Sequence, residues 1–255
     1  MNSASRLLSI VQFFNSADRN AAIQTLWEKY LGPSPTPLSE EDVLTAVQAM
    51  LAEIRIMEAK LKSIGAPEQL YSDCVNRLRS SFSPTQLNVP WVNHREPIER
   101  QATSLALQWA EWALSISDED EIDDAAMQEL RANLESQEQL LKDTELPAGL
   151  REMLERQTAS LRRALQLYRI GGVEPVRKVV SDSYGELATA SEELVQEVAS
   201  SPSNVQEVFQ KGKRLIGNAA EIADKGSKVI KFGKEVYDLG KAGWQIGQEL
   251  LRLTQ

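Results

Sequence analysis

The C-terminal stretch 203–255 reads SNVQEVFQKGKRLIGNAAEIADKGSKVIKFGKEVYDLGKAGWQIGQELLRLTQ. Small residues stand at every seventh position of this stretch: Gly212, Ala219, Gly226, Gly233, Gly240 and Gly247. Large apolar residues, among them Val229, Val236 and Trp244, follow three or four positions after members of this series. Seven residues make nearly two helical turns, so this period is typical of a helix that buries one face. The stretch predicts an amphipathic helix, or a hairpin of two such helices, over residues 202–255.

The glycines in this series destabilise a helix unless another surface packs against them. Each interior glycine costs about 1 kcal/mol relative to alanine, so five of them cost about 5 kcal/mol. A line of small residues lets a second helix approach closely, and the added contacts offset that cost. We therefore assign a helix-packing or assembly face to the six small residues together with Val229, Val236 and Trp244. The partner is the rest of the chain, another protein or a second copy.

The helical period continues through the rest of the chain. One apolar stripe ends at Gly32, where three prolines in residues 33–37 prevent a helix from continuing. Ser39 and Asp42 have the spacing of a capping box, and Gly65 ends the helix that they begin. Residues expected to face the core include Leu70, Tyr71, Cys74 and Leu78 within 67–81, and Ile98, Ala102, Leu105, Trp109 and Trp112 within 98–116. No strand alternation is visible, so the sequence predicts an all-α multi-helix bundle or a stack of helical hairpins.

The charge is divided unevenly along the chain. The whole sequence has 28 basic and 37 acidic residues, a net charge of −9. Residues 204–255 hold nine of the basic and six of the acidic residues, a net of +3, which leaves −12 for the remainder. We therefore expect two domains, an acidic helical body over 1–201 and a basic amphipathic segment over 202–255. Lys228, Lys231 and Lys234 lie on the polar side of that segment and are candidates for contact with an anionic surface.

Several kinds of site are disfavoured by the residue types present. The acidic balance argues against a general nucleic-acid binder, which needs cations facing phosphates. One cysteine, Cys74, and one histidine, His94, leave little material for a disulfide, a zinc site or nucleophilic catalysis. The acidic run 118–129 has the spacing of a calcium loop, but Asp123 stands where the turn needs glycine and Ile122 offers no oxygen. The sequence therefore predicts no metal, no cofactor and no enzymatic activity.

Three further stretches resemble parts of a known group of proteins. Residues 167–177 read LYRIGGVEPVR, followed downstream by the triplet 185–187, GEL, and preceded by the loop 94–97, HREP. These are similar to a Tyr-Arg-Ile-x-Gly motif and a loop in a group of uncharacterised all-helical bacterial proteins. The resemblance implies a helical fold and a bacterial origin, and it carries no activity or catalytic residues.

The apolar stretches are too short to cross a bilayer, which takes about 20 residues. We therefore expect a cytoplasmic protein, with the inner membrane surface as the alternative location. The sequence favours a non-enzymatic helical protein whose C-terminal glycine-heptad segment mediates close helix packing or self-assembly. The alternative is a soluble bacterial effector, of toxin or defence type, whose C-terminal segment inserts into or perturbs membranes. A second alternative is an enzyme with an unrecognised carboxylate-based site.

Overall fold

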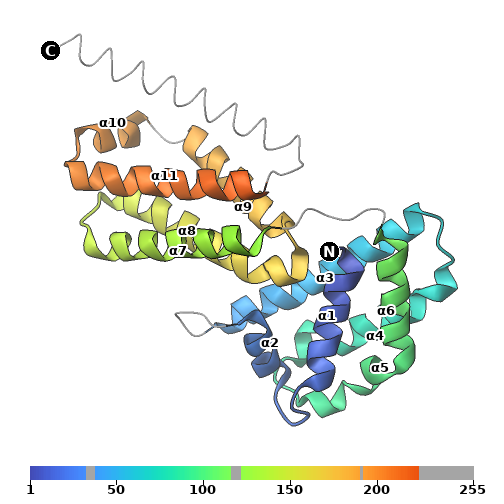
Figure 1. The fold of residues 1–255 in the computed structure, drawn as a ribbon. Helices are drawn as coiled ribbons and strands as arrows, with labels where there is room; N and C mark the ends of the chain where they lie inside the picture. Colours follow the sequence, from blue (N-terminus) through green and yellow to red (C-terminus); the bar gives the residue numbers. More distant parts are fainter. Residues whose placement is uncertain (33–37, 116–121, 190–191, 224–255) are drawn as a thin grey trace. The chain divides into compact units, whose positions relative to one another are not determined.

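The regular elements of the described residues are all helices (Figure 1). The computed structural model describes residues 1–32, 38–115, 122–189 and 192–223. These residues form eleven α-helices and three short 3-10 helices, and the helices pack together. The all-α class predicted from the apolar period is therefore confirmed. None of the described helices is long and apolar enough to cross a membrane.

The helices group into two compact units. Among the described residues, unit 1 comprises 1–32, 38–115 and 166–172, and unit 2 comprises 122–165, 173–189 and 192–223. The expected domains 1–201 and 202–255 stay a prediction, because most of the second lies outside the described residues. The described first part of the C-terminal segment packs closely against helices that precede it within unit 2.

Unit 1 is built from six α-helices and three 3-10 helices. These are α1 (Ser3–Ser16), α2 (Ile23–Leu31), α3 (Glu40–Ser63), η1 (Glu68–Leu70), α4 (Ser72–Ser81), η2 (Pro84–Gln86), η3 (Trp91–Asn93), α5 (Glu96–Glu99) and α6 (Gln101–Ala113). Its core holds a cluster of aromatic rings, in which the centroids of Phe14 and Phe82 lie 4.9 Å apart. Trp91 also donates a hydrogen bond from Nε1 to the Phe14 carbonyl at 2.9 Å. This bond satisfies the polar atom of a fully buried indole.

The helix ends in unit 1 follow the local chemistry of the sequence. Ser39 caps α3, and the Asp42 side chain accepts a bond from the Ser39 backbone, so the predicted capping box is confirmed. Gly32 follows α2 with φ 87°, and Gly65 follows α3 with φ 73°. Residues with a Cβ atom rarely adopt these positive φ angles, which explains why glycine stands at both positions.

Two expectations about the core of unit 1 are wrong. Ala102, Leu105 and Trp112 of α6 are exposed, the latter two by 53% and 74%, while Thr103, Leu107 and Ala110 are buried. Helix α6 is apolar on two faces, and the buried face is the one on which the Thr103 hydroxyl reaches the Pro97 carbonyl at 2.9 Å. Leu70 is 46% exposed. The expected helix over 67–81 is divided between η1 and α4, so Leu70 in η1 does not share a helical face with the buried residues of α4.

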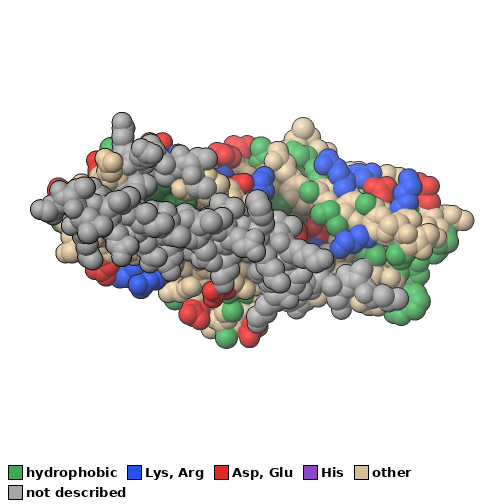
Figure 2. Space-filling view, turned by 90° about the horizontal axis from the view of Figure 1, so that it is seen from above, with side chains coloured by type: hydrophobic (Ala, Val, Ile, Leu, Met, Phe, Trp, Pro, Cys, Tyr) green, Lys and Arg blue, Asp and Glu red, His purple; other side chains and the backbone are tan. Residues whose placement is uncertain are grey.

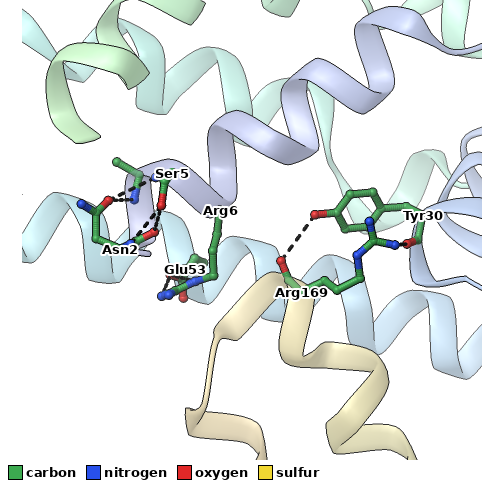
Figure 3. A network of polar contacts seen from close by, with 7 residues as sticks. Asn2, Ser5, Arg6, Tyr30, Glu53 and Arg169 are labelled. Atoms are coloured by element: carbon green, nitrogen blue, oxygen red, sulfur yellow. Dashed lines mark hydrogen bonds and ion pairs between the residues drawn. The ribbon is translucent and has the colours of Figure 1, made fainter. Parts of the chain in front are cut away.

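A buried ion pair joins α1 to α3 in unit 1. The Nε atom of Arg6 donates to Glu53 Oε1 at 2.9 Å, and the side chains of Arg6 and Glu53 are 4% and 2% exposed. Figure 3 shows this pair beside Asn2, whose side-chain oxygen accepts hydrogen bonds from the first turn of α1. Removing two charges from water is costly, and the attraction between Arg6 and Glu53 offsets part of that cost.

We predict that replacing both members of this pair destabilises the protein less than replacing either one alone. Arg6→Met or Glu53→Leu alone removes one member of the buried pair and should lower the free energy of unfolding by about 3–5 kcal/mol. The double replacement Arg6→Met/Glu53→Leu should be more stable than either single variant. Urea unfolding followed by circular dichroism measures all four proteins. Additive losses in the double variant would contradict the coupling.

Unit 2 contains the remaining helices. These are α7 (Asp124–Asp143), most of α8 (Ala148–Gly171), α9 (Glu174–Thr189), α10 (Glu192–Ser200) and α11 (Ser203–Ala223). Helix α11 packs against α7 and α9, and it runs antiparallel to α7 (Figure 1). A cluster of buried residues at one end of these helices includes Leu141, Leu150, Met153, Leu154, Val205 and Val208.

Candidate helix-packing site

The first members of the glycine series lie on the buried side of α11. Gly212 and Ala219 are both buried. An ideal Cβ atom built on Gly212 would lie 2.7 Å from Cδ2 of Leu154 on α8 and 3.2 Å from Nε2 of Gln137 on α7. Real Cβ atoms essentially never approach another heavy atom within 3.0 Å. The absence of a side chain at position 212 therefore lets α11 approach both helices closely.

The remainder of α11 separates into an apolar face and a charged face. The buried positions beside Gly212 and Ala219 are Val205, Val208, Leu215, Ile216, Ala220 and Ala223. Glu207, Arg214 and Glu221 are exposed and also stand seven residues apart. Within 203–223, the heptad pattern therefore corresponds to packing inside one chain rather than to a free surface.

The other predicted members of the packing face lie outside the described residues. They are Gly226, Gly233, Gly240, Gly247, Val229, Val236 and Trp244. The lysines expected to meet an anionic surface, Lys228, Lys231 and Lys234, also lie outside the described residues.

Two polar side chains from neighbouring helices bind backbone carbonyls of α11. Gln137 donates from Nε2 to the Val208 carbonyl at 3.3 Å, and Arg177 of α9 donates from Nε to the Ala223 carbonyl at 3.1 Å. Gln137 is 2% exposed, so its bond forms inside the interface. Sequence reasoning missed both residues, because a single glutamine on a helix has no spacing signal and Arg177 stood in a motif without an assigned role.

Helices α7 and α11 lie antiparallel, and the segments that extend from the Gln137–Val208 contact to the start of α7 and to the end of α11 are nearly equal in length. From Gln137 back to its first residue, Asp124, helix α7 extends about 20 Å at 1.5 Å per residue. From Val208 to Ala223, helix α11 extends about 22 Å on the same basis. Because Gln137 bonds to Val208, α7 supplies an opposing surface for α11 as far as about Ala223. The four later glycines follow that point in the sequence.

The resemblance motif forms a structural contact in unit 1. Arg169 donates from Nη1 to the Tyr30 carbonyl at 2.8 Å, and the Tyr30 hydroxyl donates to the Arg169 carbonyl at 3.4 Å (Figure 3). The Arg169 guanidinium carbon also lies 5.0 Å from the centre of the Tyr30 ring. These contacts join the last turn of α8 to α2, and burial raises the pKa of Tyr30. The motif residues that make these contacts have a packing role.

The chain contains metal-binding residue types and one cysteine, Cys74. No group of three or more His, Cys, Asp or Glu side chains among those residues is arranged to hold a metal ion. Cys74 is buried, and burial raises the pKa of its thiol to about 12, so the thiol stays protonated at neutral pH. On the face shown in Figure 2, acidic and basic side chains of the described residues are interspersed.

Gly212→Ala and Gly217→Ala are a matched pair of substitutions within α11. A Cβ atom at Gly217 would meet nothing within 4 Å, so Gly217→Ala should stabilise the protein by up to about 1 kcal/mol through helix propensity. Gly212→Ala gains the same propensity but displaces Leu154, and such overpacking costs about 1–3 kcal/mol. The difference between the free energies of urea unfolding of the two variants gives the cost of the contact between the added methyl group and Leu154. Equal stabilities would show that Leu154 moves freely and that position 212 does not require glycine.

Comparison with known proteins adds no family assignment, since no family model, no curated protein and no solved structure matches the chain.

Proposed function

We propose that this chain is a non-enzymatic helical protein that assembles with another copy through close helix packing by its C-terminal glycine-heptad segment. The observation that carries the proposal is the approach of Leu154 to Gly212, where the first glycine of the series makes room for a leucine from another helix. The same chemistry at Gly226, Gly233, Gly240 and Gly247 would receive side chains from a partner.

The length of the α7–α11 overlap supports a partner beyond these two helices. Helix α7 begins at Asp124 and opposes α11 only as far as about Ala223. Four further heptad glycines follow, over residues 224–255. They need an opposing surface other than α7 to gain the contacts that Gly212 gains.

The energetics of glycine favour coupling between helix formation and association. Four interior glycines cost a helix about 4 kcal/mol relative to alanine. A partner that packs along the glycine line recovers this free energy through dispersion contacts over the closely approached surfaces. Association is therefore expected to raise the helix content of the segment, as in other cases of coupled folding and binding.

Size variants along the glycine line test the assembly in the full-length protein. We predict that Gly226→Leu/Gly233→Leu/Gly240→Leu abolishes the oligomer, because leucine separates the helices. The matched variant with alanine at the same three positions should still assemble, since Ala219 already occupies this series and is buried in α11. Sedimentation velocity over a concentration series measures the assembly.

Circular dichroism and thermal unfolding verify that both triple variants keep the helical body. A leucine variant that assembles like the unaltered protein would refute the proposal. A protein that stays monomeric throughout the concentration series would refute it as well.

The lysine series defines the contrasting candidate, in which the segment of a soluble effector binds or perturbs an anionic membrane. Lys228, Lys231 and Lys234 lie on the polar side of the heptad wheel and would face lipid headgroups. We predict that replacing the three lysines with glutamine weakens assembly less than the leucine variant does, because the glycine line is unchanged. Co-sedimentation of the full-length protein with phosphatidylserine vesicles, lost in the glutamine variant and kept in the leucine variant, would favour the membrane candidate instead.

A further inference from the structure

Helix α6 carries a second apolar face that points away from the core of unit 1. Leu105 is 53% exposed and Trp112 is 74% exposed, and both stand on the side opposite the buried Leu107 and Ala110. Tryptophan is highly buried on average, so this degree of exposure is unusual. The sequence of α6 contains one charged residue, Glu111. Its outer face is therefore apolar and nearly uncharged, as is common at interaction surfaces.

A depression adjoins the exposed indole. Its volume is about 400 Å³, and its lining includes Met1 and Ser5 at the start of α1 together with Gln108, Glu111, Trp112 and Ser115. Glu111 supplies the one charged side chain among its described lining residues. An indole face beside a carboxylate attracts a basic side chain, by cation–π interaction and by ion pairing.

The spacing on α6 matches the spacing of the glycine series. Leu105 and Trp112 are seven residues apart, a rise of about 10.5 Å along the helix. Successive glycines at 226, 233, 240 and 247 are also seven residues apart, so in a helix they have the same rise. Two protruding side chains at this interval can enter two glycine positions at the same interval. Leu154 at Gly212 is an example of a leucine packed against this series.

The charges are complementary as well. The sequence directly after α6 contains four consecutive acidic residues over 118–121, and Glu111 precedes them. Residues 225–234 contain four lysines and no acidic residue. A helix that laid its glycine line on α6 would bring its lysines near Glu111, a residue of opposite charge beside Trp112.

We infer that the outer face of α6, with Leu105 and Trp112 at its centre, is the docking surface for the C-terminal segment 224–255 of a second copy. This inference rests on the proposed self-assembly and identifies the opposing surface for it. The two complementary surfaces lie on different parts of the same chain, so the contact is heterologous. Such contacts propagate from copy to copy, and they close into rings or extend as filaments.

Matched leucine substitutions test the surface in the full-length protein. Leu105→Lys and Leu70→Lys introduce the same change at leucines that are 53% and 46% exposed. Leu105→Lys should weaken assembly by about ten-fold or more, because it removes a buried leucine from the interface and adds a charge that has the same sign as the lysine segment. Leu70→Lys should leave the association constant within about two-fold. Circular dichroism and sedimentation velocity measure folding and assembly for both variants.

A cross-linking experiment tests which segment occupies the surface. Ser115→Cys places a thiol in the depression, and Ser227→Cys places one beside Gly226. When the two variants are mixed and treated with a short bismaleimide, a covalent pair of chains should form. Ser16→Cys, at the opposite exposed end of α1, should give no such pair with Ser227→Cys. The native Cys74 is buried with a pKa of about 12, so it does not compete.

The outcomes separate this inference from the proposed function. If the unaltered chain assembles but Leu105→Lys assembles equally well, or the Ser115 and Ser227 variants do not cross-link, the α6 surface is wrong and the self-assembly stands. If the unaltered chain is monomeric, both proposals fail. A cross-link within one chain carrying both cysteines, formed equally at high dilution, would show docking of a chain on itself and overturn the second-copy assignment.

Discussion

The arrangement of unit 2 depends on the close approach of three helices at one glycine. At Gly212 the methyl group of Leu154 occupies the space that a Cβ atom would need, and Gln137 bonds to the neighbouring carbonyl of Val208. A Cβ atom at this position would require the ends of the Leu154 and Gln137 side chains to move. The aliphatic side chains on either side of Gly212, Val208 and Leu215, are buried at this helix separation. The packing of α11 thus depends on the small size of residue 212 as well as on the burial of apolar side chains.

Much of the fold could be predicted because the signals for a helix and its ends lie within a few residues of one another in the sequence. The helical spacing of apolar residues, the glycines that end helices and the Ser39–Asp42 capping box are such signals. The structure confirms the predictions made from them. The choice of face on α6 could not be predicted this way. Both faces carry apolar residues, and the decision depends on where Thr103 meets Pro97 and Cys74. Such contacts join separate elements and leave no periodic trace in the sequence.

For the candidate packing site, the small residues on α11 could be predicted, whereas the residues that oppose them could not. The heptad of small residues pointed to Gly212 and Ala219 from spacing alone, and both are buried. The opposing residues, Leu154 and Gln137, were ordinary members of two other helices, so no pattern associated them with α11. Sequence periodicity identifies a face that needs a partner, whereas the identity of the partner depends on tertiary structure.

The contact between Tyr30 and Arg169 also affects how the protein folds. These residues are 139 positions apart, and Ile170 beside them is fully buried in the core of unit 1. The first 121 residues therefore emerge from the ribosome without a segment that their own core requires, and residues 122–165 are synthesised before that segment appears. Contacts of such large sequence separation slow folding, because a long loop must close before they form. Completion of unit 1 is consequently a late event, after most of the chain has been made.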